Sequence, residues 1–221
     1  MIAIQAAAFC LFYFGRRRSG SKALRLSPSV DSNSAFKYSL KIMNKKSQFK
    51  GYVQVYTGNG KGKTTAALGL ALRAAGHGQR VYIGQFLKGQ TYGELISIKK
   101  IFPLIAIEQF GRKGFVHVTK DPDLEDIDRA KRGLKKCLAA MLSKKFRIIV
   151  LDEINVAVDL NLITEAEVHK FLDQKPGDVE VVLTGRYAPA SFIKRADLVT
   201  EMKERKHYYK KGVMARKGIE K

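Results

Sequence analysis

Cysteine is scarce in this chain of 221 residues, which contains only Cys10 and Cys137 and no CxxC pair or Cys/His cluster. The sequence therefore indicates neither a disulfide framework nor a structural zinc site, and we expect a reducing, cytoplasmic setting. The four histidines lie far apart, without a spacing of the HxxxH type. This pattern speaks against a metal site built from histidines.

The N-terminal region also lacks a run that could cross a membrane. The apolar stretch 1–14 is too short to span a bilayer, and the arginines at 16–18 follow it, on the wrong side for a secretory signal. We therefore expect neither export nor membrane attachment. Residues 19–47 are rich in Ser, Lys and Arg, with Asp31 as the only acid, as in transit peptides, disordered leaders and upstream sequence translated in error.

The expected domain organisation follows from this composition. Met43 stands shortly before the first expected strand and would be a natural start, so we favour the interpretation as upstream sequence. We expect residues 1–42 to be a disordered leader or a misassigned start, 43–202 to form the folded domain, and 203–221 to be a basic C-terminal tail of that domain.

Acidic residues are outnumbered, with 20 Asp and Glu against 41 Lys and Arg and a net charge of +21. Most of the excess lies at the ends, because residues 1–50 carry 10 basic residues against 1 acid, and residues 201–221 carry 8 against 3. Terminal charge is normally solvated, so nucleic-acid binding is only weakly supported. With 45% hydrophobic and 28% charged residues, the rest fits one globular α/β domain.

A glycine- and lysine-rich loop follows the first expected strand, which covers residues 52–57 and is β-branched or aromatic apart from one amide. Glycines without a Cβ let backbone N–H groups turn toward phosphate oxygens, and two lysines supply the countercharge. We expect the following residues to bind a nucleotide: Gly58, Asn59, Gly60, Lys61, Gly62, Lys63, Thr64 and Thr65.

The loop opens into an alanine-rich helix expected at 64–75, whose dipole points at the bound anion. Thr64 stands where the pattern GxxxxGK[ST] places a hydroxyl that binds Mg²⁺. The first glycine of the pattern is replaced by Thr57, so a bound triphosphate need not lie as it does in ordinary ATPases. The alternative is a glycine turn in a basic protein, but the strand before the loop and the helix after it favour a phosphate-binding loop.

Strand and helix patterns alternate along the rest of the chain, which predicts right-handed βαβ units and a mostly parallel sheet. Beyond the first strand and helix, we expect strands at 81–86, 104–110, 146–151, 179–183 and 197–202, and helices at 91–100, 123–142, 164–172 and 188–196. The fold class is therefore α/β, with ligand-binding loops at the carboxyl ends of the strands.

Two strand ends carry charged residues that suit phosphate chemistry. The apolar strand 146–151 ends in Asp152 and Glu153, and a carboxylate beside the phosphate loop can hold Mg²⁺ directly or through water. Arg186 follows the strand 179–183 and is a candidate phosphate clamp. The alternatives are acids that merely end a strand and a solvated surface arginine.

Five segments occur together in one order: TGNGKGKTTAALGLALRAAGHG, GQFLKG, VLDEINVAVDLNLI, VVLTGRYAP and ADLVTEMKERKHYYKKGVMARKGIEK. From about Gly51 to the C-terminus the chain thereby resembles the P-loop family of ATP:corrinoid adenosyltransferases, which act on cob(I)yrinic acid a,c-diamide or cob(I)alamin. The resemblance is specific because the variant loop, the DE strand end, the TGR turn and the C-terminal segment all occur together.

The resemblance implies a P-loop NTPase fold with a RecA-like sheet, helices on both faces, and a homodimer. It implies transfer of the 5′-deoxyadenosyl group of ATP to the Co(I) centre of a corrinoid, with release of triphosphate and with Mg²⁺ as cofactor. A Co(II) reductase such as a flavoprotein would supply Co(I). The reduced corrinoid is itself the nucleophile, which agrees with the lack of a Ser/His/Asp or Cys/His constellation.

The resemblance also implies roles for particular residues. Lys61, Lys63 and Arg186 would offset the charge that builds on the leaving triphosphate, and Arg73 would contact the nucleotide. Thr64 and Glu153 would be the ligands of Mg²⁺. Phe115, after Gly114, matches an aromatic that some family members place against the lower face of the corrin. His117 stands where a second aromatic is expected, and we assign it no role.

Two other functions remain open on the sequence alone. A basic P-loop ATPase could use Glu153 to activate water and its tails to bind nucleic acid, although only residues 206–211 interleave aromatic and basic side chains. The third interpretation is a regulatory protein that binds a nucleotide but catalyses no reaction. The sequence also leaves open whether the corrinoid would be the diamide precursor or salvaged cobalamin.

Overall fold

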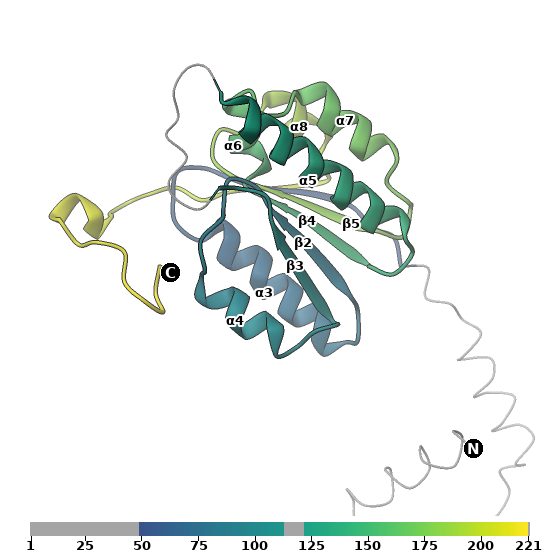
Figure 1. Ribbon diagram of the computed structural model, residues 1–221, viewed down its shortest axis with the longest axis horizontal. Coiled ribbons are helices and arrows are strands. Elements are labelled where there is room, and N and C mark those ends of the chain that lie inside the picture. The colour runs from purple at the N-terminus through teal and green to yellow at the C-terminus, as the bar shows by residue number, and fades with distance from the viewer. Residues whose placement is uncertain (1–48, 113–121, 221) are drawn as a thin grey trace, which may run out of the picture. The chain divides into compact units, whose positions relative to one another are not determined.

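Six parallel strands form one sheet in the order β3-β2-β4-β5-β1-β6. The computed structural model describes residues 49–112 and 122–220, and Figure 1 shows the sheet between two layers of helices. The strands are β1 Val53–Thr57, β2 Val81–Gln85, β3 Ile105–Gln109, β4 Ile148–Asp152, β5 Glu180–Thr184 and β6 Leu198–Glu201. Every pairing is parallel, so all carboxyl ends meet at one edge of the sheet.

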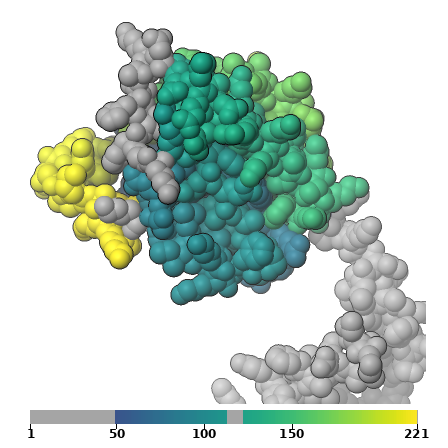
Figure 2. Space-filling model, viewed as in Figure 1, coloured from purple at the N-terminus to yellow at the C-terminus, as the bar shows by residue number. Residues whose placement is uncertain are grey.

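The helices divide between the two faces of the sheet. Figure 1 shows α3 and α4 on one face and α5 to α8 on the other. Their bounds are α3 Lys63–Gly76, α4 Gly93–Lys99, α5 Leu124–Leu142, α6 Ile154–Asp159, α7 Glu165–Asp173 and α8 Ala190–Arg195, and a short 3-10 turn, η1, covers Tyr208–Lys211. The C-terminal residues, yellow in Figure 2, stand out from the rest of the surface. No helix within residues 49–112 and 122–220 is both long and apolar enough to cross a membrane.

The core lies on both faces of the sheet because the central strands are buried on both sides. All five residues of β4 are buried, and its side chains alternate between two clusters. Ile149 and Leu151 pack with α5 to α8, whereas Ile148 and Val150 pack with α3 and α4. A continuous apolar run is what a parallel strand with helices on both faces requires.

One glycine lets helix α5 approach the sheet closely. A Cβ at Gly84, in the middle of β2, would lie 2.4 Å from the sulfur of Cys137 on α5. Cys137 is completely buried, and this burial raises the pKa of its thiol, so the side chain stays neutral. Among the described residues, Cys137 is a free cysteine that serves packing.

The predicted α/β class and parallel sheet are confirmed, and each expected strand and helix is present with ends shifted by a few residues. One helix was missed. Helix α6 lies between the expected strand 146–151 and the expected helix 164–172, where we expected no helix. Its residues Ile154, Asn155, Ala157 and Val158 are buried, so the short segment shows no amphipathic period that would mark a helix.

Candidate active site

A cavity of about 610 Å³ lies at the carboxyl edge of the sheet. The loop after β1 and the start of α3 form one wall with residues 59–65, and α4 contributes residues 92–94. Residues 218–220 of the C-terminal segment close another side, and Lys88, Glu153 and Arg186 complete the charged lining. The volume lies within the range of small-molecule sites.

The loop after β1 needs glycine for two reasons. Gly58 and Gly62 have φ angles of 93° and 124°, which other residues rarely adopt. A Cβ would also be too close to the carbonyl oxygen of Met202, at 2.4 Å if built on Gly58 and at 2.7 Å if built on Gly60. The backbone N–H of Gly60 donates to that same oxygen at 2.6 Å, so the loop packs directly on the chain that follows β6.

Thr57 replaces the first glycine of the usual pattern, and its surroundings explain why a side chain fits. The residue ends β1, is buried, and is not among the non-glycine residues with positive φ. Its hydroxyl oxygen accepts a hydrogen bond from the backbone N–H of Ala188 at 3.3 Å. Thr57 thus ties the phosphate loop to the segment after β5.

Lys63 is the first residue of α3, and it is only 7% exposed. Its ammonium donates to the carbonyl oxygens of Gly58 at 2.7 Å and Gly60 at 2.8 Å. Burial lowers the pKa of Lys63, while the charge of Glu153 opposes this shift. Gly62 at the N-cap offers no side-chain cap, so the first-turn N–H groups of α3 are available to an anion.

Lys61 points to the C-terminal segment instead. Its ammonium donates to Glu220 Oε1 at 2.8 Å, to the Tyr208 hydroxyl at 3.2 Å and to the carbonyl oxygen of Ile219 at 3.3 Å. These hydrogen bonds, that to Glu220 first, raise the pKa of Lys61. The sequence predicted Lys61 at the site but gave no sign that the C-terminal segment returns to it.

Asp152 is the carboxylate that contacts the phosphate loop. It is 1% exposed at the end of β4 and accepts hydrogen bonds on both oxygens. The donors are Thr64 Oγ1 at 3.0 Å, Thr184 Oγ1 at 2.7 Å, Gln85 Nε2 at 3.1 Å and Lys88 Nζ at 2.8 Å. Strand β5 lies between β1 and β4, so Thr184 at its end links the loop side of the site to Asp152.

Glu153 follows Asp152 in a left-handed conformation, with φ at 64°, and caps α6. Its backbone N–H donates to the hydroxyl oxygen of Thr184 at 3.0 Å. The side chain lines the cavity, and burial, followed by the charge of Asp152, raises the pKa of its carboxyl. Glu153 and Thr64 line the same cavity, and the positive φ of Glu153 is a strained conformation that persists only where neighbouring structure holds it.

Lys88 is a site residue that the sequence analysis did not single out. It follows Leu87, whose φ of 61° turns the chain at the end of β2. Its ammonium contacts Asp152 Oδ2 at 2.8 Å and Thr64 Oγ1 at 3.1 Å. The only local hint was its position after a strand, in the segment GQFLKG.

The donor chemistry at Thr64 suits a magnesium ion. The Thr64 hydroxyl contacts Asp152, Glu153 lines the same cavity, and hydroxyl and carboxylate oxygens are the hard ligands that Mg²⁺ prefers. The ammonium of Lys88 already contacts both the hydroxyl and Asp152. No group of three or more Asp, Glu, His or Cys side chains gathers in the described ranges. The protein would therefore share the ion with phosphate and water, as is usual for Mg²⁺.

The remaining predicted residues are placed differently. Arg186 lines the cavity and is exposed, whereas Arg73 lies in the last turn of α3, is exposed, and is not among the lining residues. Ten residues of helix separate Arg73 from Lys63, about 15 Å along the axis. Phe115 and His117 lie outside the residues that the structure describes.

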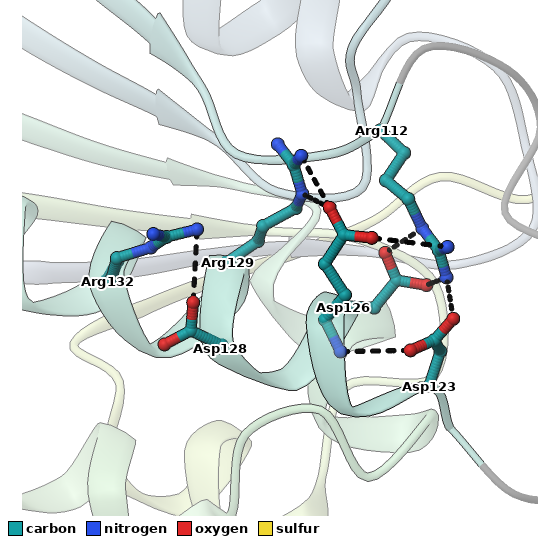
Figure 3. A network of polar contacts seen from close by, with 7 residues as sticks. Arg112, Asp123, Asp126, Asp128, Arg129 and Arg132 are labelled. Atoms are coloured by element: carbon teal, nitrogen blue, oxygen red, sulfur yellow. Dashed lines mark hydrogen bonds and ion pairs between the residues drawn. The ribbon is translucent and has the colours of Figure 1, made fainter.

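Arg112 binds acids that follow in the next element, as Figure 3 shows. It donates to Asp126 Oδ1 at 2.7 Å through Nε and to Oδ2 at 2.6 Å through Nη2, and to Asp123 Oδ2 at 2.7 Å. Asp123 also caps α5 by accepting from the backbone N–H of Glu125. These ion pairs hold together the described residues on either side of 113–121, where Phe115 stands.

The cavity is lined by the N-terminal residues of α3, by lysine and arginine side chains, and by Glu153 after the end of β4. These features define a P-loop nucleotide-binding protein with a RecA-like α/β fold, as the sequence predicted. Within that class, the sequence profile of the family ATP:corrinoid adenosyltransferase BtuR/CobO/CobP matches residues 49–220. The chain belongs to this family.

Individual relatives agree with the family match. A corrinoid adenosyltransferase from a Sinorhizobium species is 38% identical over 182 residues, which cover 81% of this chain and 85% of the relative. The corrinoid adenosyltransferase of Pseudomonas aeruginosa is 35% identical over 77% of this chain and 84% of its own length. The corrinoid adenosyltransferase CobA of Salmonella typhimurium is 35% identical over 77% of this chain and 86% of its own length.

Proposed function

We propose that this protein transfers the 5′-deoxyadenosyl group of ATP to the Co(I) centre of a corrinoid and releases triphosphate, as a step of adenosylcobalamin synthesis. The observation that carries the proposal is the cavity at the glycine-rich loop, which four cationic side chains line in a chain of this family. These side chains are Lys61, Lys63, Lys88 and Arg186.

In this reaction the protein's task is electrostatic. An electron pair of Co(I) forms the bond to the ribose 5′ carbon, and the electrons of the broken carbon–oxygen bond leave with the triphosphate. Negative charge therefore grows on the leaving group, where Lys61, Lys63 and Arg186 would offset it. Lys63 is buried, so its charge is screened little by water and acts strongly at short range.

Magnesium would supply further neutralisation of the triphosphate when bound, and we propose that Thr64 and Glu153 hold it. The hydroxyl of Thr64 already contacts Asp152, which would orient it. Glu153 is the carboxyl in the lining whose charged form is disfavoured by burial, so a cation beside it would restore that form. Asp152 would not bind the ion itself but would position its surroundings, because it accepts hydrogen bonds from the hydroxyls of Thr64 and Thr184.

Other parts of the assignment stay predictions. We propose that the loop residues from Gly58 to Thr65 bind ATP, that Phe115 contacts the corrin, and that Arg73 contacts a nucleotide. We also propose a homodimer in the cytoplasm that receives Co(I) from a reductase such as a flavoprotein.

The experiment that tests the function mixes the protein with Mg·ATP and a chemically reduced corrinoid and follows the loss of the Co(I) spectrum. We expect the loss to require both ATP and protein and to yield a photolabile adenosylated product. Parallel reactions with the diamide and with cobalamin would identify the preferred corrinoid. A folded protein that leaves both Co(I) spectra unchanged would contradict the proposal.

A further inference from the structure

Lys88 occupies an unusual position for a lysine at the edge of a sheet. Its side chain is only 17% exposed, and it reaches from the end of β2 to the end of the neighbouring strand β4. There it forms an ion pair with Asp152, which is almost completely buried. A buried carboxylate needs such compensation, because removing the partner of a buried charge is costly.

The ammonium of Lys88 also touches the phosphate loop. Lys88 Nζ lies 3.1 Å from Thr64 Oγ1 and 2.8 Å from Asp152 Oδ2, and Thr64 itself contacts the other oxygen of Asp152 at 3.0 Å. Lys88 therefore stands at the meeting point of the hydroxyl and the carboxylate next to which the magnesium ion is proposed to bind. Two cations cannot share this point without strong repulsion.

We propose that Lys88 is an exchangeable cation of the active site. Without nucleotide it holds Asp152 and Thr64 in place, and when Mg·ATP enters, its ammonium leaves Asp152 and binds the triphosphate. The side chain lines the cavity, so this exchange requires only rotation about side-chain bonds. Lys88 would thereby be a further catalytic residue that contacts the leaving group.

The proposal rests on the proposed function only for the identity of the anion. The alternative is a purely structural ion pair that stabilises the strand ends and never moves. The two roles differ in what removal of the charge does to anion binding. Removal of Lys88 frees Asp152 for a divalent ion in either case, so tighter binding of that ion shows that Lys88 occupies the cation position. An exchangeable cation also contacts the anion, so its removal must weaken binding of triphosphate, whereas a purely structural pair predicts no such loss.

The test compares Lys88→Met and Lys88→Arg with the wild type. Lys99→Met is the matched control, because it removes the same charge from an exposed position on α4. Binding of Mn²⁺ without nucleotide is measured by electron paramagnetic resonance, and binding of inorganic triphosphate without metal is measured by calorimetry. Neither measurement involves corrinoid or adenosyl transfer, so a failure of the proposed function would not affect the result.

We expect Lys88→Met to bind Mn²⁺ about tenfold more tightly than the wild type, which is about 1.4 kcal/mol, and triphosphate about tenfold more weakly. Lys88→Arg keeps the charge and should match the wild type in Mn²⁺ affinity, as should Lys99→Met. If Lys88→Met does not fold, Lys88→Gln retains a donor to Asp152 and gives the same comparison. Unchanged affinity for either ion in the folded, uncharged variant would overturn the proposal.

Discussion

Two cavities of similar size lie at opposite edges of the sheet. The cavity at the P-loop measures about 610 Å³, and one at the amino ends of β2, β4 and β5 measures about 660 Å³. Both are lined by basic residues, and the second has Arg80, Lys144, Lys145 and Arg147. Neither volume nor the sign of charge therefore distinguishes the active site.

Burial of charge distinguishes the charged groups at the two cavities, although Glu180, at the amino end of β5 and outside the second cavity, is also buried. At the carboxyl edge, Lys63 and Asp152 are 7% and 1% exposed and make several hydrogen bonds within the protein. At the amino edge, Arg147 and Asp178 form a 2.6 Å ion pair, but their side chains are 37% and 63% exposed. Water screens the exposed pair, whereas buried charges act strongly on a ligand.

Backbone strain follows the same division. Leu87, Glu153 and Tyr187 have positive φ angles, and each follows a strand at the carboxyl edge. On the amino side, Lys144 has such an angle, in the turn before β4. Strained backbone persists only where neighbouring structure holds it, and it concentrates at functional sites.

The largest effect is expected at the buried lysine of the loop. Lys63→Ala should raise the barrier to transfer by about 2 to 4 kcal/mol, which lowers the rate about 30- to 10³-fold, by analogy with the loss of one oxyanion donor. The rate at saturating ATP and circular dichroism of the variant check this. Near-normal turnover by a folded variant would show that the buried charge of Lys63 at the carboxyl edge does not act on the leaving group.

A smaller but still large effect is expected from Glu153→Gln. The variant should transfer more slowly by about tenfold or more, because it holds Mg²⁺ less well, and raised Mg²⁺ should recover part of the rate. A titration of the rate with Mg²⁺ measures this. If the rate falls and no concentration of Mg²⁺ restores any of it, Glu153 acts as a base, which the proposed chemistry does not require.

The same substitution should change stability in a pH-dependent way. Because burial raises the pKa of Glu153, the folded state binds its proton more tightly than the unfolded state does. The wild type therefore loses stability as pH rises above the ordinary carboxyl range, and glutamine does not. Thermal unfolding should show Glu153→Gln gaining more in Tm over the wild type at about pH 8 than at about pH 4; an equal difference at both would contradict this.

Much of this architecture could be predicted from the sequence, because local patterns carry it. The apolar run before Asp152, the glycines around Lys63 and the alternation of strands and helices fix the α/β class and the P-loop. The proximity of Lys88 to Asp152 could not be predicted. It depends on the order of strands in the sheet, which places β2 beside β4, and on the positive φ of Leu87.

The contacts of the C-terminal segment could not be predicted from the sequence either. Its basic composition predicted a solvated tail, yet Glu220 and Tyr208 contact Lys61 across about 150 positions of sequence. Arg73 was assigned by resemblance alone, and its contact with a nucleotide stays a prediction. It lies in the last turn of α3 and is not among the residues that line the cavity of its own chain.

An effect of a few-fold is expected from the exposed contact between Lys61 and Glu220. Glu220→Gln removes a negative charge that lies at the cavity and competes with phosphate for Lys61, so it should tighten binding of inorganic triphosphate by about threefold. Calorimetry at low and high salt measures this, because the gain should shrink at high salt. Weaker binding by the variant would show that Glu220 positions Lys61 instead.

The smallest effect is expected at the amino edge. Arg147→Ala breaks an exposed ion pair with Asp178, and such pairs contribute about 0 to 1 kcal/mol. The rate of transfer should stay within about twofold of the wild type, as is usual for surface substitutions. Rate and thermal unfolding measured beside Lys63→Ala complete the comparison, and a loss of activity comparable to that of Lys63→Ala would make the second cavity functional.

The central claim is that the P-loop cavity holds the leaving group of an adenosyl transfer, and phosphorus NMR of the products of ATP tests it most directly. With reduced corrinoid, the wild type should form intact triphosphate and adenosylated corrinoid in equal amounts, and without corrinoid it should be nearly idle. Steady release of ADP and phosphate at a rate that corrinoid does not change and that added nucleic acid increases would contradict the claim.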